Sequence, residues 1–445
     1  LKTKRKPDLN YLESIEENYK IPLWLIAAND RFFNHYNRFY KFSTDEILLI
    51  LEDEIKLFEM ILDEVNPDFL IIPSTHQQHN HIFYEICKAR NCKILLMEST
   101  KTSHSKGSLR KAGNSFYLTD KPDKFLPLPK TIKQNIYKKN IQKEKFEMID
   151  DQYSDKKFSS TFQTSRLKFF KAILKFLLTA DTNIQTHYTY FGRSKIRVIF
   201  KTITYELRKK YRKNFMDKNL SRAIENRSPF IYFPLHQEQE KVTLIGAPFY
   251  INQFEIIQNI AKSLPVGYKL YVKDHIVMNV RGWRSVYEMK EIINLHNVEL
   301  LHPSVNGDEL IKKSDLVISI KGSSTIEAAF CSKPSITFEN VGLYQISSIH
   351  KLVSMKELPQ AIKNSLGTKV NPDELKKYLD AVGEHSFKFP FVEIYTNFED
   401  QFKIGGYFAN VEVDTQKIVE FLEKFKSEFT HLALIYIEKI KQLSN

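Results

Sequence analysis

Polar and charged residues gather at three points of the sequence, each directly after a short apolar run. The run at 315–320 is followed by a Gly-Ser turn and a carboxylate: Lys321, Gly322, Ser323, Ser324, Thr325 and Glu327. Glycine lets the backbone approach an anion closely, and a helix start offers N–H groups and partial positive charge. We therefore expect this turn to bind a phosphate and Glu327 to accept ribose hydroxyls. A plain N-capped turn is the alternative.

The second group follows the apolar run at 268–273 and comprises Lys273, Asp274, His275, Asn279 and Arg281. Lys and Arg bind anions, and His donates hydrogen bonds or exchanges protons near neutral pH. We expect Lys273 and Arg281 to bind the same phosphate and His275 to be catalytic. A solvated basic loop is the alternative.

The third group follows the run at 230–234 and comprises His236, Gln237, Glu238, Gln239 and Glu240. A carboxylate here can act as a base or contact sugar hydroxyls. We expect His236 to bind the ligand and Glu240 to be catalytic, the alternative being a plain polar loop.

The N-terminal part carries further candidates after apolar runs: Asp30, Arg31, His76, His79, His81, Glu98 and Lys101. Asp30 and Glu98 are the candidate catalytic acids or bases. The histidine spacing matches no zinc motif and no cysteine pair supports one, so we predict no metal site. His81 is expected on a helix surface.

Alternating strands and helices must position these residues. In the N-terminal part we predict strands at 22–28, 69–73 and 93–97, with helices at 44–65 and 79–91. The alternation restarts with strands at 230–234, 268–273, 298–301, 315–320 and 334–338, separated by helices, and ends with one or two helices at 415–443. This pattern predicts an α/β protein with parallel sheets, whose ligands bind at the carboxyl ends of the strands.

The predicted organisation has four parts. Rossmann-like, doubly wound domains span 1–155 and 219–395. A basic segment spans 156–218, and a helical segment at 396–445 packs back on the N-terminal domain. Two Rossmann-like domains with a C-terminal helical segment describe the GT-B architecture.

Composition excludes several classes of protein. The 445 residues include 42% hydrophobic residues, 33 Phe and 22 Tyr, too many for a mainly disordered chain. Three cysteines, Cys87, Cys92 and Cys331, indicate a reducing compartment and no disulfide scaffold. No stretch is apolar enough to span a bilayer, and no signal peptide is recognisable. We expect a cytoplasmic protein, and we expect that residues are missing before Leu1, which is not Met.

The formal net charge of +13 has one source. Between Lys156 and Lys218 there are sixteen basic and three acidic residues, so the rest of the chain is neutral. In 166–179, apolar residues recur at helical spacing beside a Lys face, which is typical of a helix at a membrane interface. The predicted contacts with an anionic membrane are Arg166, Lys168, Lys171, Lys175, Arg208, Lys209, Lys210, Arg212 and Lys213. A solvated Lys face is the alternative, and no motif supports nucleic-acid binding.

Three stretches of the sequence, which contain the candidate site residues, resemble a known protein family. The stretches FPLHQEQEKVT, YKLYVKDH and SDLVISIKGSSTIEAAF are similar to bacterial capsule polysaccharide biosynthesis proteins, a group that includes retaining β-Kdo glycosyltransferases using CMP-Kdo. The resemblance covers about 229–345 well and the N-terminal part loosely. His236, Glu240, Thr243, Lys273, His275 and Gly322 fit its motifs, whereas Glu238, Gln239, Asp274 and Ile276 depart from them.

The resemblance implies a metal-independent glycosyltransferase at the inner face of the cytoplasmic membrane. It would transfer a Kdo-like or related sugar from a nucleotide-activated, CMP-linked donor to a surface polysaccharide or glycolipid, without a further cofactor. The domain at 1–155 would bind the acceptor and the domain at 219–395 the nucleotide-sugar donor. Three alternatives stay open: a sugar-nucleotide 2-epimerase, a polyol-phosphate polymerase resembling teichoic acid enzymes, and an inactive membrane-associated scaffold.

Overall fold

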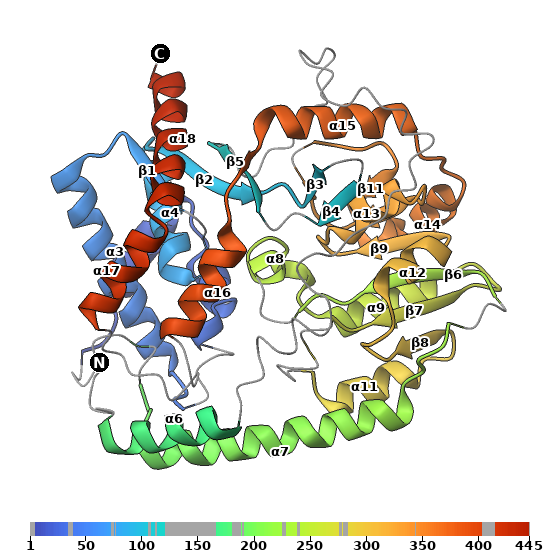
Figure 1. Cartoon of the computed structure of the whole chain (residues 1–445), viewed down its shortest axis with the longest axis horizontal. Coiled ribbons are helices and arrows are strands. Elements are labelled where there is room, and N and C mark those ends of the chain that lie inside the picture. The colour runs from blue at the N-terminus through green and yellow to red at the C-terminus, as the bar shows by residue number, and fades with distance from the viewer. Residues whose placement is uncertain are drawn as a thin grey trace.

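The protein is an α/β protein built around two main sheets, as predicted (Figure 1). The computed structural model describes residues 5–33, 39–72, 75, 77–105, 108–111, 114–120, 166–179, 188, 191–224, 228–237, 241–275, 278, 284–342, 344–402 and 414–444. The first sheet takes three strands from the N-terminal part and a short fourth strand from residues 387–388, whereas the strands of the second sheet all follow residue 229.

The second sheet has six parallel strands in the order β11-β10-β9-β6-β7-β8. Its strands are β6 (Phe230–Pro234), β7 (Lys269–Lys273), β8 (Val298–Leu301), β9 (Leu316–Ser319), β10 (Ser335–Thr337) and β11 (Ile349–Lys351). Counted along the chain, this is the doubly wound order 3-2-1-4-5-6 of a Rossmann fold. The winding reverses between β6 and β9, which are neighbours in the sheet. The five strands predicted for this part are confirmed.

Helices cover both faces of this sheet because its strands are apolar on both sides. On one face, Ile231 and Phe233 of β6 share a core with Ile256 of α9 and Ile362 of α14. On the other face, Tyr232 lies in a cluster with residues of α12 and α13. The elements around the sheet are α8 (Lys241–Leu244), η4 (Pro248–Tyr250), α9 (Gln253–Ser263), α11 (Val286–Ile293), α12 (Gly307–Lys313), α13 (Ser324–Phe330), η5 (Met355–Glu357), α14 (Leu358–Leu366) and α15 (Pro372–His385).

The N-terminal sheet is mixed, with strand order β1-β2-β5-β12. β1 and β2 pair in parallel across helix α4, as the predicted βαβ alternation requires. β5 pairs antiparallel with β2, and β12 pairs antiparallel with β5 at the edge of the sheet. A separate hairpin joins β3 and β4. The elements of this part are α1 (Leu9–Tyr19), α2 (Leu23–Ala28), α3 (Thr44–Val65), β1 (Phe69–Ile72), α4 (Gln78–Ala89), β2 (Lys93–Ser99), β3 (Thr102–Ser105), β4 (Ser108–Lys111), β5 (Ser115–Thr119) and β12 (Phe387–Lys388).

The predicted strand at 22–28 is wrong, because this segment forms helix α2. Leu23, Ile26 and Ala27 are buried at the i, i+3, i+4 spacing of a helix, while Trp24 is exposed. The Glu16 carboxylate accepts the Leu23 N–H at 2.8 Å and so satisfies one of the unpaired N–H groups at the helix start.

Two helical segments connect the N- and C-terminal parts. α6 (Arg166–Thr179) and α7 (Lys195–Asn219) lie along one edge of the molecule, and α7 runs from the N-terminal part to the second sheet (Figure 1).

At the C-terminus, α16 (Phe391–Phe402), α17 (Thr415–Lys424) and α18 (Lys426–Ser444) follow β12. Phe421 of α17 and Phe425, which caps the C-terminus of α17, pack in one apolar cluster with Phe116 of β5. Within the described ranges, no helix is long and apolar enough to cross a membrane.

Candidate functional site

The predicted chemical groups meet at the carboxyl edge of the six-stranded sheet. His236 follows β6, Lys273 ends β7, and the turn that starts at Lys321 follows β9. The crevice beside the reversal of winding, between β6 and β9, is where open α/β sheets bind their ligands. The three groups therefore share one location, set by the strand order.

His236 lies at the centre of this edge. Its backbone is fixed by Gln253, whose side-chain oxygen accepts the His236 N–H at 2.8 Å and whose amide donates to the His236 carbonyl at 3.2 Å. Its ring Nε2 lies 3.1 Å from Ser319 Oγ and accepts the Lys321 backbone N–H at 3.4 Å. Because Nε2 is an acceptor in this arrangement, the neutral ring carries its proton on Nδ1.

The protonation state of His236 agrees with this geometry. Burial and the nearby positive charge of Lys101 lower the pKa of His236 to about 4. The ring is therefore neutral at pH 7, and its Nδ1–H is a donor. Among the described residues, no hydrogen bond to that nitrogen is formed.

Gly322 is required by the closeness of its neighbours. A Cβ at this position would lie 2.5 Å from Ser319 Oγ, 3.1 Å from His236 Cε1 and 3.1 Å from Ser324 Oγ. The Gly322 N–H also donates to Ser319 Oγ at 3.1 Å. An imidazole and two hydroxyls thus converge on one bare Cα, and no partner for the buried Ser324 hydroxyl is present in the described part of the chain.

The remaining residues of the turn hold its shape. Thr325 Oγ1 donates to the Gly322 carbonyl at 2.9 Å, and Ser323 Oγ donates to Glu327 Oε1 at 2.8 Å. Both Thr325 and Glu327 are buried. Lys321 extends toward the Gly246 carbonyl, 3.4 Å from its Nζ. Thr325 and Glu327 thus form hydrogen bonds within the turn, whereas the Ser324 hydroxyl and the Nδ1–H of His236 have no hydrogen-bond partner among the described residues.

The loop after β7 is organised by a buried ion pair. Arg284 Nε lies 3.1 Å from Asp274 Oδ2, and Arg284 also pairs with Glu288 on α11. Asp274 Oδ1 accepts the His275 N–H at 3.1 Å, so Arg284 fixes the backbone that carries His275. Gln237 Nε2 lies 3.5 Å from His275 Nδ1, which brings the loops after β6 and β7 together. Arg284 was not expected in the site, and its only sequence signal is the i, i+4 spacing to Glu288.

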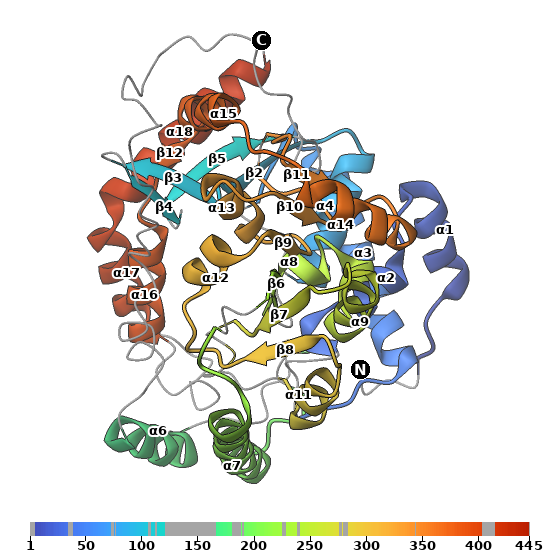
Figure 2. The ribbon, with the colours of Figure 1, turned by 90° about the vertical axis from the view of Figure 1, so that its right-hand side faces the viewer.

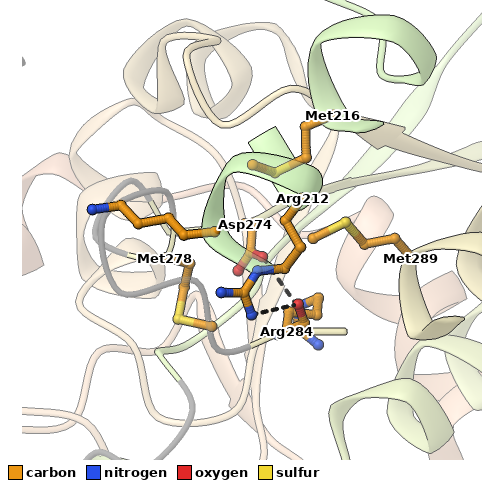
Figure 3. A pocket seen from close by; sticks show the side chains of 7 residues that line it. Arg212, Met216, Asp274, Met278, Arg284 and Met289 are labelled. Carbon is orange, nitrogen blue, oxygen red and sulfur yellow. Dashed lines mark hydrogen bonds and ion pairs between the residues drawn. The ribbon is translucent and has the colours of Figure 1, made fainter. Parts of the chain in front are cut away.

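Helix α7 reaches the same ion pair from the other side (Figure 3). Arg212 Nη1 lies 3.5 Å from the Arg284 carbonyl, and Arg212 and Lys209 line a small cavity with Asp274 and Met278. Both residues were predicted to contact a membrane. In the structure they lie on the face of α7 that packs against the domain of the second sheet.

The N-terminal part approaches this edge through the end of β2. Lys101 follows β2 in a left-handed backbone conformation, φ 63°, and its charge acts on His236. Glu98 lies opposite Tyr117 in the β2–β5 register. Tyr117 packs against the cluster around Tyr344 and Tyr378 of the C-terminal part. Lys101 and Glu98 therefore lie on the side of the N-terminal sheet that meets the C-terminal part.

Asp30 has a structural environment instead. It is 3% exposed, and its oxygens accept the backbone N–H groups of Phe32 at 2.7 Å, Phe33 at 3.1 Å and Gln78 at 3.0 Å. These bonds join the end of α2 to the start of α4. The prediction of Asp30 as a catalytic base is not supported, since both of its oxygens are occupied by the protein backbone.

Several predicted site residues lie outside the described residues: Glu240, Arg281, His76, Asn279, Glu238 and Gln239. The side chains of Arg166 and Lys168 are likewise not described. His81 lies on α4 with Nε2 3.6 Å from Glu85 Oε1, on the helix as expected. Within the described ranges, no three His, Cys, Asp or Glu side chains are grouped as metal ligands would be.

No protein-family model and no curated protein matches the chain. Distant similarity is found to solved structures. A KpsC β-Kdo 2,7-transferase from Thermosulfurimonas dismutans is 11% identical over 80% of this chain and 96% of its own, with a TM-score of 0.34. The β-Kdo 2,4-transferase of the same KpsC is 9% identical over 72% of this chain and 80% of its own, with a TM-score of 0.33. A UDP-GlcNAc 2-epimerase from Neisseria meningitidis is 13% identical over 77% and 80%, with a TM-score of 0.27.

Proposed function

We propose that this protein is a GT-B glycosyltransferase that transfers a Kdo-like or related sugar from a CMP-linked donor to a surface polysaccharide or glycolipid. The donor nucleotide would lie at the carboxyl edge of the six-stranded sheet, and the acceptor would enter from the N-terminal part. The observation that carries this proposal is the meeting of His236, Ser319 and Gly322 where the Rossmann winding reverses.

The residues of the edge suit a phosphate of the donor. Lys273 and Lys321 supply positive charge, and the Nδ1–H of neutral His236 and the Ser324 hydroxyl supply donors. Gly322 keeps the backbone open at the point of approach. Positive charge and fixed donors stabilise the negative charge that builds up on a departing phosphate.

The chemical step needs a base for the acceptor hydroxyl. Of the carboxylates proposed from the sequence, Glu98 lies on the side of the N-terminal sheet that meets the C-terminal part, whereas Asp30 accepts hydrogen bonds from three backbone N–H groups. Glu98 would take the proton as the acceptor oxygen bonds to the anomeric carbon and CMP leaves. His275, held by Asp274 and beside Gln237, would act near the transferred sugar. Glu240 and Arg281 keep the roles proposed for them from the sequence, Glu240 as a catalytic residue and Arg281 as a donor-binding residue.

The identity of the donor rests on the resemblance to capsule polysaccharide biosynthesis proteins. His236, Lys273, His275 and Gly322 stand where that family's motifs have the same residues. CMP and a Kdo-like sugar follow from that resemblance, as does an acceptor at the inner face of the cytoplasmic membrane. Glu238, Gln239 and Asp274 differ from the family's motifs. These differences concern which sugar is transferred and leave the phosphate-binding turn unchanged.

Calorimetric titration with CMP, CDP and UDP tests the donor site. We expect CMP to bind, and a ligand at about 100 times its Kd to raise the free energy of unfolding by about 2.7 kcal/mol in a parallel thermal-shift assay. Failure to bind any of the three nucleotides would contradict the proposal and favour the scaffold alternative. Epimerisation of a UDP-sugar without an acceptor would favour the 2-epimerase alternative instead.

A further inference from the structure

An apolar stripe runs along the solvent-facing side of helix α7. Ile196, Phe200, Ile203, Leu207 and Tyr211 follow one another at spacings of three or four residues, which places them on one face of a helix. All five side chains are between 55% and 82% exposed. Exposed apolar patches of this size are unusual on a soluble protein and mark interaction surfaces.

The stripe is opposite to the face by which α7 packs on the rest of the protein. Val198 and Met216 are buried and lie about five turns apart, so they share a face. Leu207 lies midway between them in sequence, about two and a half turns from each, and therefore points the other way. The contacts of α7 with the protein core thus leave the stripe uncovered by the described residues.

Helix α6 extends the same surface. Phe170, Leu174 and Leu178 recur every four residues and are 50% to 74% exposed, while Phe176 is buried in a cluster with Val198. Figures 1 and 2 show α6 and α7 side by side along one outer edge of the molecule. Each helix therefore packs by one face and presents apolar side chains on another.

Basic side chains flank the stripe on both sides. Seen around the helix axis, one flank lies about a quarter to a third of a turn from the stripe and carries Arg197, Lys201 and Arg208. The opposite flank carries Lys210 and Lys213. All five are exposed. On α6, Lys171 and Lys175 are exposed beside the apolar residues. Glu206 is the one acidic side chain between Lys195 and Lys213, so the surface is strongly positive.

We propose that α6 and α7 form a docking surface for an anionic lipid bilayer, with the helices lying in the plane of the membrane interface. The stripe enters the boundary of headgroups and acyl chains, and the flanking Lys and Arg contact anionic headgroups. Charge complementarity selects this occupant. A second copy of the chain on the same stripe would bring two positive surfaces together, which opposes association. The inference is independent of the proposed sugar transfer, because binding to vesicles requires no turnover.

Co-sedimentation of the full chain with vesicles tests this surface. The probes are vesicles of phosphatidylcholine alone and of phosphatidylcholine with phosphatidylglycerol, each at low and moderate salt. We expect binding to the anionic vesicles that weakens as salt rises, and little binding to the neutral ones. The double variant Phe200→Ser/Leu207→Ser should bind anionic vesicles at least about 10-fold more weakly at unchanged net charge.

Two controls make the test specific. Val419→Ser/Leu422→Ser removes two comparably exposed apolar side chains from α17 and should bind like the unchanged protein. Lys210→Gln/Lys213→Gln should weaken binding about 10-fold or more, whereas Lys363→Gln/Lys369→Gln lowers net charge equally and should have little effect.

Four results would overturn the proposal. They are no binding to either vesicle, equal binding to both, unchanged binding by the Phe200→Ser/Leu207→Ser protein, and stripe-dependent dimers seen by light scattering at the assay concentration. Circular dichroism and thermal unfolding of each variant establish that it is folded, and all substituted positions are exposed, so the folded state should persist.

Discussion

Ser319 Oγ lies 3.1 Å from Nε2 of His236, and this contact joins the ends of the two strands between which the chain reverses its winding. Gly322 N–H donates to the same hydroxyl. The imidazole is therefore tied, through one serine, to the turn proposed to bind the donor phosphate. Because His236 and Gly322 both contact Ser319 Oγ, a substitution of any one of these three residues should change the positions of the other two.

The first prediction concerns pH and His236. Its pKa is lowered to about 4 by burial and by Lys101, whereas an unfolded histidine titrates near 6.5. Between pH 6.5 and 4, His236 therefore binds a proton in the unfolded state but not in the folded state. Its contribution to the free energy of unfolding is full above pH 6.5 and is lost as the pH falls toward 4. In His236→Gln, whose amide oxygen can still accept the Lys321 N–H, we expect this loss to shrink by on the order of 2 kcal/mol.

Urea unfolding of both proteins at pH 7, 5.5 and 4.5 measures this difference. Other groups titrate in the same range, but they contribute equally to both proteins and cancel in the comparison. Parallel pH profiles of the two proteins would show that His236 is not held neutral.

The second prediction concerns the crowded glycine of the turn. In Gly322→Ala, the new Cβ meets Ser319 Oγ at 2.5 Å and His236 Cε1 at 3.1 Å, so the turn or the imidazole must move. We expect a loss of about 1–3 kcal/mol in stability and at least a 10-fold loss of nucleotide affinity. Gly367→Ala is the control, because its Cβ would meet only the Asn364 carbonyl at 3.6 Å. Equal nucleotide affinity for the two variants, measured by calorimetry, would place the phosphate elsewhere.

The third prediction concerns the buried arginine under the β7 loop. Arg284 is 1% exposed, and Arg284→Ala leaves Asp274 as a buried carboxylate without its partner. Breaking such a pair costs about 3–5 kcal/mol. Arg222→Ala breaks the pair with Asp217, which is much more exposed, and should cost about 1 kcal/mol or less. Urea unfolding compares the two, and similar losses would mean that the Arg284 pair contributes little.

The fourth prediction concerns His275, whose side chain is exposed at the end of β7. His275→Ala should leave the free energy of unfolding within about 0.5 kcal/mol of that of the unchanged protein, because substitutions of exposed side chains usually have small effects. Turnover of a CMP-linked sugar should be lost if His275 acts near the transferred sugar. A variant that is stable and fully active would remove His275 from the site.

The second sheet could be predicted almost strand by strand from the sequence. Parallel strands buried on both faces appear as continuous apolar runs such as Phe230–Pro234, bounded by polar turns. The mixed character of the first sheet could not be predicted. β12 has two residues and pairs with β5 across more than half the chain, so no local pattern indicates it.

The candidate site was predictable by position and less so by role. Residues that follow parallel strands meet at one edge, which is why His236, Lys273 and Lys321 could be named together. Burial could not be predicted, because Arg and Asp are rarely buried and nothing local distinguishes Arg284 or Asp30. Similarly, the net charge of the basic segment can be counted from the sequence. Which face of α7 packs against the protein cannot be predicted from it, because Val198 and Met216 contact distant parts of the chain.

The last prediction concerns Glu54 in the N-terminal part. Burial raises the pKa of Glu54 to about 8, and the neighbouring Asp30 carboxylate adds to the rise, although the hydrogen bond from Gln78 opposes it. The folded state thus holds a proton that an unfolded Glu releases near pH 4.5, so stability from this group is full below pH 4.5 and is lost as the pH rises through 8. Glu54→Gln keeps an oxygen to accept from Gln78 and has no proton to lose. Relative to the unchanged protein, we expect it to be more stable at pH 9 than at pH 5 by on the order of 2 kcal/mol. Thermal and urea unfolding at the two pH values measure this, with the exposed Glu64→Gln on the same helix as control. If Glu54→Gln and Glu64→Gln show the same pH dependence, then Glu54 is ionised at neutral pH and the cluster around Asp30 carries a second negative charge.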